Sequence, residues 1–330
     1  MTLQTNQKTV LLILLAFIFS FSIRLIWVEQ FSTAEQFKFN NQFMINTNDG
    51  YYYAEGARDI LAGKTEVTND LSPITSAPSI LTAAIAKILP LSFETILFYM
   101  PAFFGSLLVI PIILIGRLLN NLEIGFIAAL IGSIAWSYYN RTMIGYYDTD
   151  LLNIVLPTFL LWSLIWAVDT KKPIYLLITA IEILVYRWWY PQSVALEFAF
   201  VGLIAIYALY QYIALRKNPK NIEFKTALTF ALKLISIMLV AMMMVDGYIR
   251  AALVAGLFLL IRDEKYDKYI YAISAASLLA FLSTGGIQLI WGKLEAYVFK
   301  SSIKETVEGL NLHFFTVMQT IREAGQIPFE

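Results

Sequence analysis

"TVLLILLAFIFSFSIRLIWV", residues 9–28, is a run of twenty residues in which Arg24 carries the only charge. A helix of about twenty apolar residues is long enough to cross a hydrocarbon core of about 30 Å. The run follows Lys8 as a secretory signal would, but it continues to Val28 without a small-residue cleavage site. We therefore predict a retained transmembrane helix, with the Arg24 side chain extended to the outer interface.

The rest of the chain has a similar composition. Of its 330 residues, 58% are hydrophobic and 15% are charged, and the mean hydropathy is +0.65. Soluble domains, in contrast, carry charges at about a quarter of their positions. Apolar windows along the chain predict an all-α polytopic membrane protein with about nine spans. We expect these spans at residues 9–28, 95–116, 124–140, 151–168, 173–187, 193–215, 226–245, 249–261 and 269–291.

The positive charges indicate the orientation of these spans. With a cytoplasmic N-terminus, the short inner connections hold eleven Lys and Arg residues and the short outer connections hold three. An excess of positive charge marks the inner side. The inner set is Lys8, Arg117, Lys171, Lys172, Arg216, Lys217, Lys220, Lys225, Arg262, Lys265 and Lys268, and the outer set is Arg141, Arg187 and Arg250.

Two segments are too long to be simple connections between spans. Residues 29–94 form a long outer loop inside a transmembrane domain that we place at residues 1–291. Residues 292–330 follow the last span, and we expect them to begin a second large outer loop. The turn at residues 141–150 faces the same side, so all three segments meet the periplasm if the membrane is a bacterial inner membrane.

The composition also limits the kinds of site. With no cysteine there is neither a disulfide framework nor a thiolate metal site. His313 is the only histidine, which argues against an imidazole zinc site and against Ser-His catalysis. The formal net charge is zero, and no nucleic-acid partner is expected. A metal ion in this chain would have to be held by oxygen atoms.

Two outer segments contain isolated aspartates. In "TNDGYYYAEGARD", residues 47–59, an Asn-Asp-Gly turn would leave Asp49 projecting, and an ordinary solvated turn is the alternative. In "GYYDTD", residues 145–150, Asp148 and Asp150 would lie on one side of an extended backbone but on nearly opposite sides of a helix. The alternative is that one of them caps the helix that follows.

A third acid lies in the tail segment "QTIRE", residues 319–323. Thr320 and Glu323 match a capping box, yet the following "AGQIP" does not continue as a helix. Three outer segments therefore put carboxylates on one membrane face. Their oxygens suit a hard divalent cation such as Mg²⁺ or Mn²⁺, whose charge would favour a pyrophosphate leaving group on a membrane-anchored substrate.

Four stretches that contain these residues resemble the bacterial asparagine-linked oligosaccharyltransferases of the PglB type, homologues of the eukaryotic catalytic subunit. They follow the order and spacing of that family across essentially the whole chain, which is more specific than a lone Asp-x-Asp. The stretches are "MINTNDGYYYAEGARD" (44–59), "SYYNRTMIGYYDTD" (137–150), "RWWYP" (187–191) and "TIRE" (320–323).

The resemblance implies a GT-C membrane fold and a reaction. An oligosaccharide would pass from a polyprenyl-pyrophosphate donor in the membrane to the side-chain nitrogen of asparagine in an acceptor polypeptide with an Asn-x-Ser/Thr sequon. The implied ligands of the Mn²⁺ or Mg²⁺ ion are Asp49, Asp148, Asp150 and Glu323.

The resemblance also implies roles beyond metal binding. Asp49 and Glu323 would hydrogen-bond the acceptor carboxamide, Arg141 would lie in the same pocket, and Tyr190 would contact the lipid-linked donor. The family continues with further spans and a periplasmic domain whose Trp-Trp-Asp-Tyr-Gly motif reads the sequon hydroxyl. This chain ends at Glu330 without that motif, so the resemblance implies an N-terminal fragment that lacks the C-terminal periplasmic domain.

Two other functions remain open from the residues themselves. Another polyprenyl-linked GT-C glycosyltransferase would also have outer-face acids, although the Thr-Ile-x-Glu tail favours an oligosaccharyltransferase. A transporter would distribute ionisable residues through the membrane depth. Lys233 lies within a predicted span, and its expected partner is Glu182 or Glu197, or else it has a functional role.

Overall fold

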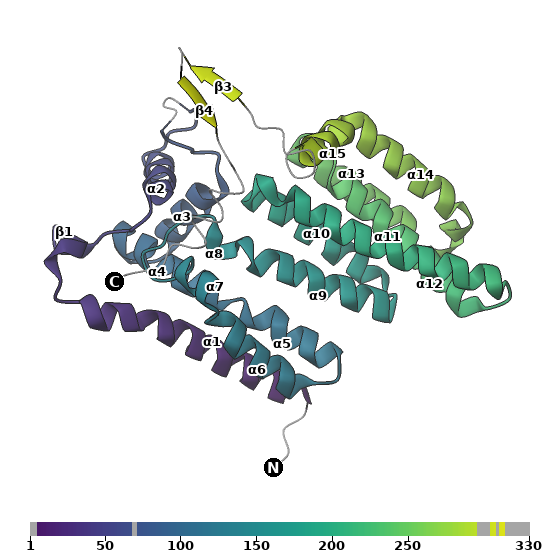
Figure 1. Ribbon diagram of the computed structural model, residues 1–330, viewed down its shortest axis with the longest axis horizontal. Coiled ribbons are helices and arrows are strands. Elements are labelled where there is room, and N and C mark those ends of the chain that lie inside the picture. The colour runs from purple at the N-terminus through teal and green to yellow at the C-terminus, as the bar shows by residue number, and fades with distance from the viewer. Residues whose placement is uncertain (1–4, 68–70, 296–303, 308–309, 314–330) are drawn as a thin grey trace.

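The computed structural model describes residues 5–67, 71–295, 304–307 and 310–313, so Glu323 and its tail motif lie outside the described residues. The described chain is a bundle of helices with two small antiparallel hairpins (Figure 1). In the first half, the elements are α1 (Thr5–Phe31), η1 (Glu35–Phe37), β1 (Lys38–Phe39), β2 (Gln42–Phe43), α2 (Asn48–Leu61), α3 (Ala77–Ile88), α4 (Phe93–Ser106), α5 (Val109–Leu118), α6 (Leu122–Ser133) and α7 (Trp136–Asn140).

The second half continues the bundle, and η marks its short 3₁₀ or π segments. Its elements are α8 (Asp150–Asn153), α9 (Val155–Thr170), α10 (Pro173–Trp189), η2 (Pro191–Ser193), α11 (Val194–Lys217), α12 (Ile222–Ala241), α13 (Gly247–Ile261), η3 (Glu264–Tyr269), α14 (Ile270–Phe281), η4 (Leu282–Gly286), α15 (Ile287–Leu294), β3 (Lys304–Val307) and β4 (Leu310–His313).

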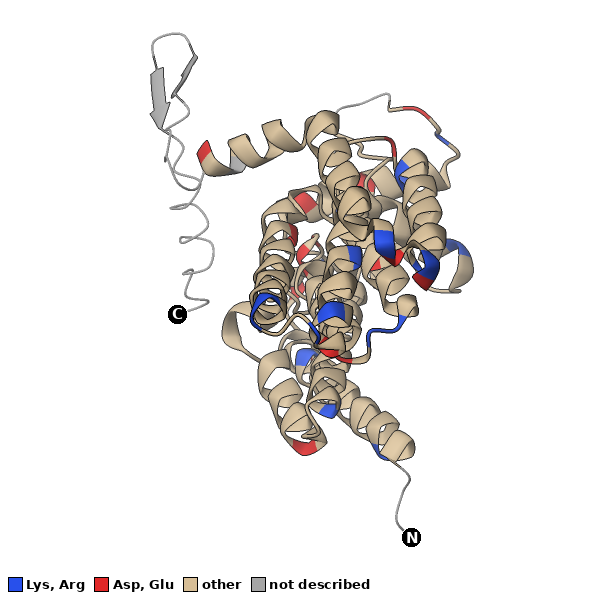
Figure 2. Ribbon diagram, turned by 90° about the vertical axis from the view of Figure 1, so that its right-hand side faces the viewer, with Lys and Arg blue, Asp and Glu red and all other residues tan. Residues whose placement is uncertain are grey.

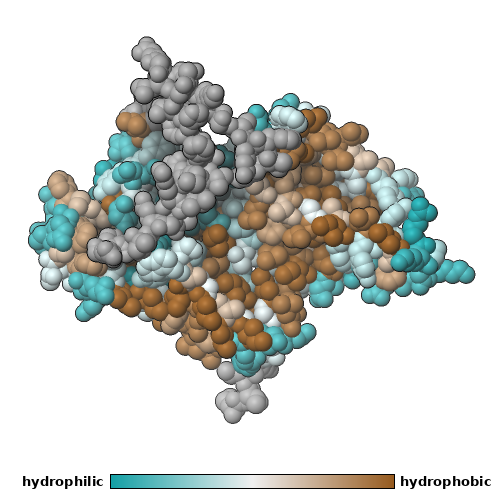
Figure 3. Space-filling model, viewed as in Figure 1, coloured by the Kyte–Doolittle hydropathy of each residue, from teal (hydrophilic) through white to brown (hydrophobic). Residues whose placement is uncertain are grey.

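The helices have the lengths and surfaces of a membrane protein. Most of the ribbon carries no charge (Figure 2), and the brown apolar surface lies between teal ends (Figure 3). Within the described residues, six helical segments are long and apolar enough to cross a membrane, while α3, α6 and α13 are shorter. The membrane fold is therefore confirmed, whereas the count of nine spans stays a prediction. The six segments are Thr5–Phe31, Phe93–Leu118, Asp150–Thr170, Pro191–Lys217, Ile222–Ala241 and Glu264–Gly292.

Four expected spans divide between two helices, and two of them, 124–140 and 269–291, contain non-helical backbone at the division. The span expected at 124–140 divides into α6 and α7, because Ala135 adopts a non-helical backbone (φ −55°, ψ 129°) between them. The span expected at 269–291 contains the π segment η4, in which Gly285 has a φ of +102°. A left-handed φ is accessible to glycine at little cost. Apolar windows detect neither interruption, since both lie within hydrophobic sequence.

Within its described residues, the long loop expected at 29–94 contains the α-helices α2 and α3 after η1 and the β1–β2 hairpin. Ser76 caps α3 by accepting a hydrogen bond from the Ser79 backbone N–H at 3.4 Å, and Pro78 lies in the first turn. Both features favour a helix N-terminus. With twelve residues, α3 is too short to cross a bilayer. Figure 1 shows α2, α3 and α8 at the same end of the bundle, and α3 contacts both α2 and α4.

The main core surrounds α12. Leu234, Ile237 and Met238 on this helix are fully buried, and α12 contacts α10, α11, α13 and α14. A second cluster lies beneath the outer loop and joins α2, α3, α4 and α8 through residues that include Tyr147 and Trp189. This second cluster fixes the end of the bundle where the predicted site residues are found.

Two expectations about charges within spans were wrong. Arg24 does not extend to the interface, because its side chain is fully buried and bonded to neighbouring helices. Lys233 pairs with neither Glu182 nor Glu197; its ammonium lies 2.5 Å from the Asp267 carboxylate on η3. Glu197 instead pairs with Arg187, at 3.2 Å. A buried charge must be paired. The partner is set by how the helices pack, and the spacing of charges in the sequence does not identify it.

Candidate active site

Asp49 lies in the first turn of α2 rather than in the expected turn. Thr47 is the N-cap, and its hydroxyl accepts a hydrogen bond from the Gly50 N–H at 3.2 Å. The same hydroxyl donates to the Tyr147 carbonyl at 2.6 Å. Thr47 thus starts the helix and fastens it to the segment just before Asp148. A carboxylate in the first turn is also favoured by the positive end of the helix dipole.

The backbone around Asp49 runs against the backbone of residues 145–147. The Asn46 N–H donates to the Gly145 carbonyl at 3.0 Å, and the Gly145 N–H donates to the Phe98 carbonyl at 2.9 Å. A Cβ atom on Gly50 would lie only 2.5 Å from the Tyr147 carbonyl oxygen. Gly50 is therefore needed for close approach, and two segments a hundred residues apart are brought together.

Asp148 and Asp150 lie at the start of α8, and the backbone between them is helical rather than extended as expected, because Thr149 has a φ of −59° and a ψ of −24°. Asp148 precedes α8, and its Oδ1 accepts a hydrogen bond from the Thr149 N–H at 2.5 Å. Asp150 is the first residue of α8, and its two oxygens are engaged separately. Arg141 Nε lies 2.5 Å from Oδ2, and Asn153 Nδ2 donates to Oδ1 at 3.1 Å. Neither aspartate is the N-cap, a position that Thr149 occupies without a side-chain cap bond.

Two buried aromatic residues hold the Asp-Thr-Asp segment in place. The Tyr147 hydroxyl shares a 2.5 Å hydrogen bond with the Thr82 hydroxyl and donates to the Pro78 carbonyl at 3.2 Å, which ties the segment to α3. The Trp189 indole N–H donates to the Thr149 carbonyl at 2.8 Å. The sequence singled out "RWWYP" for Tyr190 alone, so the role of Trp189 was missed. Only its place beside Tyr190 could have suggested it.

The local charges are unbalanced. Burial raises the pKa of Asp148 to about 6, and the negative charges of Asp150 and Asp49 act in the same direction, against the Thr149 hydrogen bonds. Burial also raises the pKa of Tyr53 to about 12, together with the charges of Asp148 and Asp49 and the nearby Tyr190 phenol. Asp49, Asp148 and Tyr190 therefore lie within electrostatic range of the Tyr53 side chain, and together these groups favour a positive charge nearby.

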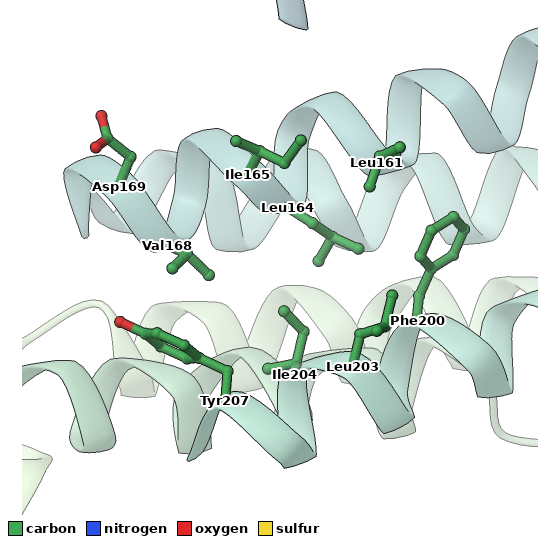
Figure 4. Close-up of a pocket in the computed structure, with 9 residues that line it drawn as sticks. All are labelled: Leu161, Leu164, Ile165, Val168, Asp169, Phe200, Leu203, Ile204 and Tyr207. Atoms are coloured by element: carbon green, nitrogen blue, oxygen red, sulfur yellow. The ribbon is translucent and has the colours of Figure 1, made fainter. Parts of the chain in front are cut away.

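An apolar groove elsewhere is not part of this site. It has a volume of about 380 Å³ and lies between α9 and α11 (Figure 4). Its lining is apolar except at one end, where Asp169 and Tyr207 stand. Asp169 is near the C-terminus of α9, whereas the aspartate segment precedes the N-terminus of that helix. The polar end of the groove therefore lies away from the aspartate segment, toward the opposite end of α9.

Comparison with known proteins identifies the family. The family model described as "Oligosaccharyl transferase STT3, N-terminal" matches residues 8–327. The chain belongs to this family. The match covers nearly the whole chain and confirms the resemblance drawn from the motifs. The STT3 relatives also show which part of a longer protein the chain corresponds to.

The undecaprenyl-diphosphooligosaccharide–protein glycotransferases of two Campylobacter jejuni strains are 40% and 39% identical to the chain over 325 residues. The alignment covers 96% of this chain but 43% of each relative. A dolichyl-phosphooligosaccharide-protein glycotransferase of Methanococcus voltae is 29% identical over 136 residues, 38% of this chain and 15% of that protein. The chain thus spans less than half the length of the curated relatives that it matches.

Solved structures of the Archaeoglobus fulgidus oligosaccharyltransferase share the fold. The apo form has a TM-score of 0.55 at 12% identity and covers 98% of this chain and 40% of its own. The complex with an inhibitory peptide and a dolichol-phosphate has a TM-score of 0.55 at 14% identity, covering 91% and 40%. A complex with Zn and sulfate has a TM-score of 0.53 at 14% identity, covering 88% and 40%.

The STT3 family implies a metal ion, and the residues present can be tested against it. Within the described part of the chain, no three acidic or histidine side chains lie close enough to hold one ion, and Glu323 lies outside that part. The donor chemistry nevertheless fits. Burial is the main cause of the raised pKa of Asp148, and the negative charges of Asp150 and Asp49 add to it. Arg141 is the cation that engages Asp150. A hard divalent cation would balance such a set of oxygens.

Proposed function

We propose that this chain is the metal-binding and donor-binding membrane part of an oligosaccharyltransferase. The enzyme transfers an oligosaccharide from a polyprenyl-pyrophosphate carrier to asparagine in Asn-x-Ser/Thr sequons of an acceptor polypeptide. One observation carries the proposal: in a chain of the STT3 family, the segment with Asp49 is hydrogen-bonded to the segment with Asp148 and Asp150. Distant acids gathered at one end of a membrane bundle suit a reaction at the membrane surface.

The side chains of the site act on an unreactive nucleophile. An amide nitrogen is a poor nucleophile because its lone pair is conjugated with the carbonyl group. The carboxylates of Asp49 and Glu323 would accept hydrogen bonds from the two amide N–H groups and twist the amide nitrogen out of conjugation. Arg141 would lie in the same pocket as the acceptor carboxamide, and Tyr190 would contact the lipid-linked donor. When bound by Asp49, Asp148, Asp150 and Glu323, Mn²⁺ or Mg²⁺ would stabilise the charge of the departing pyrophosphate.

The proposal includes the place of the chain in the cell. A cytoplasmic N-terminus in a bacterial inner membrane puts the aspartate segment on the periplasmic side, in keeping with the eleven inner bases. Residues 1–291 are the transmembrane domain, and residues 292–330 begin a second outer loop. The C-terminal region that the relatives possess would supply sequon recognition.

Donor binding by the chain itself is the first test. In lipid nanodiscs, the chain should bind a polyprenyl-pyrophosphate-linked oligosaccharide in the presence of Mn²⁺ and release it when the metal is chelated. Asp49→Ala should remove this metal dependence, because a metal ligand is lost. Glu55→Ala is the matched control, since Glu55 is an exposed acid on the same helix. Equal donor binding with and without Mn²⁺ would argue against the proposal.

Transfer is the second part of the same test. The chain joined to the C-terminal region of the Campylobacter jejuni relative should glycosylate a fluorescent Asn-x-Thr peptide. Asp49→Ala and Glu323→Ala should each abolish that transfer, while Glu55→Ala should retain it. Turnover that survives both substitutions at Asp49 and Glu323 would refute the assignment of these residues.

A further inference from the structure

Arg24 is a charged side chain buried completely within the first span. A guanidinium has five N–H donors in a rigid fork, and here each donor has an oxygen acceptor. Nε donates to the Thr142 carbonyl at 3.0 Å. Nη1 donates to the Ser20 carbonyl at 3.0 Å and the Ser20 hydroxyl at 2.8 Å. Nη2 donates to the Ser133 carbonyl at 2.9 Å and the Thr142 hydroxyl at 2.7 Å.

These acceptors lie where the bundle is interrupted. Ser133 is the last residue of α6, so its carbonyl has no partner within that helix. The Arg24 guanidinium satisfies it, and the negative end of the α6 dipole favours a cation there. The guanidinium carbon also lies 5.6 Å from the centre of the Tyr138 ring and 5.5 Å from that of Tyr139, both on α7. Arg24 therefore joins α1 to both sides of the break between α6 and α7.

Thr142 connects this network to the candidate active site. It is fully buried, and a Cβ atom on Gly105 of α4 would lie 2.6 Å from its Cβ. Thr142 is thus fixed between Arg24 on one side and the α4 backbone on the other. The preceding residue is Arg141, whose Nε lies 2.5 Å from Oδ2 of Asp150. Contacts therefore run without a gap from Arg24 through Thr142 and Arg141 to Asp150.

We propose that Arg24 is a positioning residue that holds the start of the 141–149 segment, and through Arg141 sets the place of the Asp150 carboxylate. The importance of Arg24 for metal binding rests on the proposed function, whereas its effect on the structure of residues 141–149 does not. The planar fork is required in addition to the charge. A lysine has three donors in another geometry, so Arg24→Lys keeps the charge and leaves acceptors without partners.

The first experiment measures hydrogen exchange of the backbone amides of residues 141–149 by mass spectrometry, in the metal-free chain. Arg24→Lys and Arg24→Met should each speed this exchange about tenfold or more, because lost bonds to buried acceptors weaken the local structure. Thr142→Val is a milder variant that removes one of the five bonds, and it should give a smaller change in the same segment. The control is Phe17→Ala, which removes an α1 side chain that packs on Phe103.

Phe17→Ala should lower the melting temperature without changing exchange at residues 141–149. Unchanged exchange in both Arg24 variants, or an equal change in Phe17→Ala, would overturn the proposal. The second experiment measures free Mn²⁺ by electron paramagnetic resonance. Both Arg24 variants should weaken Mn²⁺ binding about tenfold, and Phe17→Ala should not. Altered exchange in the variants together with no Mn²⁺ binding by the unaltered chain would sink the proposed function and leave Arg24 a positioning residue of the segment.

Discussion

At the scale of single residues, Trp189 offers a direct test of how the aspartate segment is held. Its side chain is 1% exposed, and its indole N–H donates to the carbonyl between the two aspartates. Trp189→Phe removes this hydrogen bond and leaves the carbonyl only its second donor, the Leu152 N–H at 3.2 Å, a loss of about 1 kcal/mol. Because the bond positions the segment between the aspartates, Mn²⁺ affinity should fall about fivefold, measured by Mn²⁺ titration. The neighbouring Trp188 is 47% exposed, and Trp188→Phe should leave Mn²⁺ affinity unchanged. Equal affinities in the two variants would contradict a positioning role for Trp189.

Sequence reasoning at this scale found the residue types but not their contacts. The i, i+2 spacing of Asp148 and Asp150 favoured an extended backbone between them, yet Thr149 is helical and Asp150 is already the first residue of α8. The same reasoning placed Asp49 in an Asn-Asp-Gly turn, although Thr47 begins a helix there. The deciding bond, from the Thr47 hydroxyl to the Tyr147 carbonyl, joins positions a hundred residues apart. Local propensity contains no information about such a partner.

At the scale of secondary-structure elements, the corner between α10 and α11 depends on a buried ion pair. Arg187 on α10 and Glu197 on α11 lie 3.2 Å apart, with side chains only 5% and 0% exposed. The Ser193 hydroxyl donates to the other Glu197 oxygen at 2.5 Å. Glu197→Gln leaves the guanidinium buried without its counter-ion, which should cost about 3–5 kcal/mol.

Thermal unfolding followed by circular dichroism in detergent checks this cost. Glu197→Gln should lower the melting temperature clearly. Glu123→Gln is the matched control, because Glu123 pairs with Lys8 where both side chains are largely in solvent, and such pairs contribute little. The same melting temperature for Glu197→Gln and the unaltered chain would show that the buried pair does not hold the corner.

Helices whose length is set by a hydrophobic run could be predicted from the sequence. Helix ends that are set by contacts with other segments could not. The run at 9–28 became α1, which extends from Thr5 to Phe31. The break after Ser133 is different. The Arg24 guanidinium is fully buried and needs oxygen acceptors, and one of them is the Ser133 carbonyl at the end of α6. Apolar windows treated Arg24 as an interfacial residue and the break as continuous helix. Both errors arise from the same unseen contact.

At the scale of the whole molecule, the two ends of the bundle differ in what they present. One end carries the long 29–94 loop with α2 and α3, next to the aspartate segment. The other end carries short connections such as that between α11 and α12, with Arg216, Lys217 and Lys220. Basic segments lie on several connections at the end facing the viewer in Figure 2. An apolar middle between two polar ends matches a bilayer crossed from end to end.

The absence of cysteine makes this orientation simple to measure. Thr65 lies in the exposed part of the long loop, and Asn218 lies in the exposed connection between α11 and α12. With the basic connections in the cytoplasm, Thr65→Cys should react with a membrane-impermeant maleimide in intact spheroplasts, because its thiol faces outward. Asn218→Cys should react only after lysis, and the unaltered chain should react in neither state. Labelling of Asn218→Cys but not Thr65→Cys in intact spheroplasts would show that the orientation is the opposite of the one predicted. The aspartate segment, at the same end as the long loop, would then face the cytoplasm.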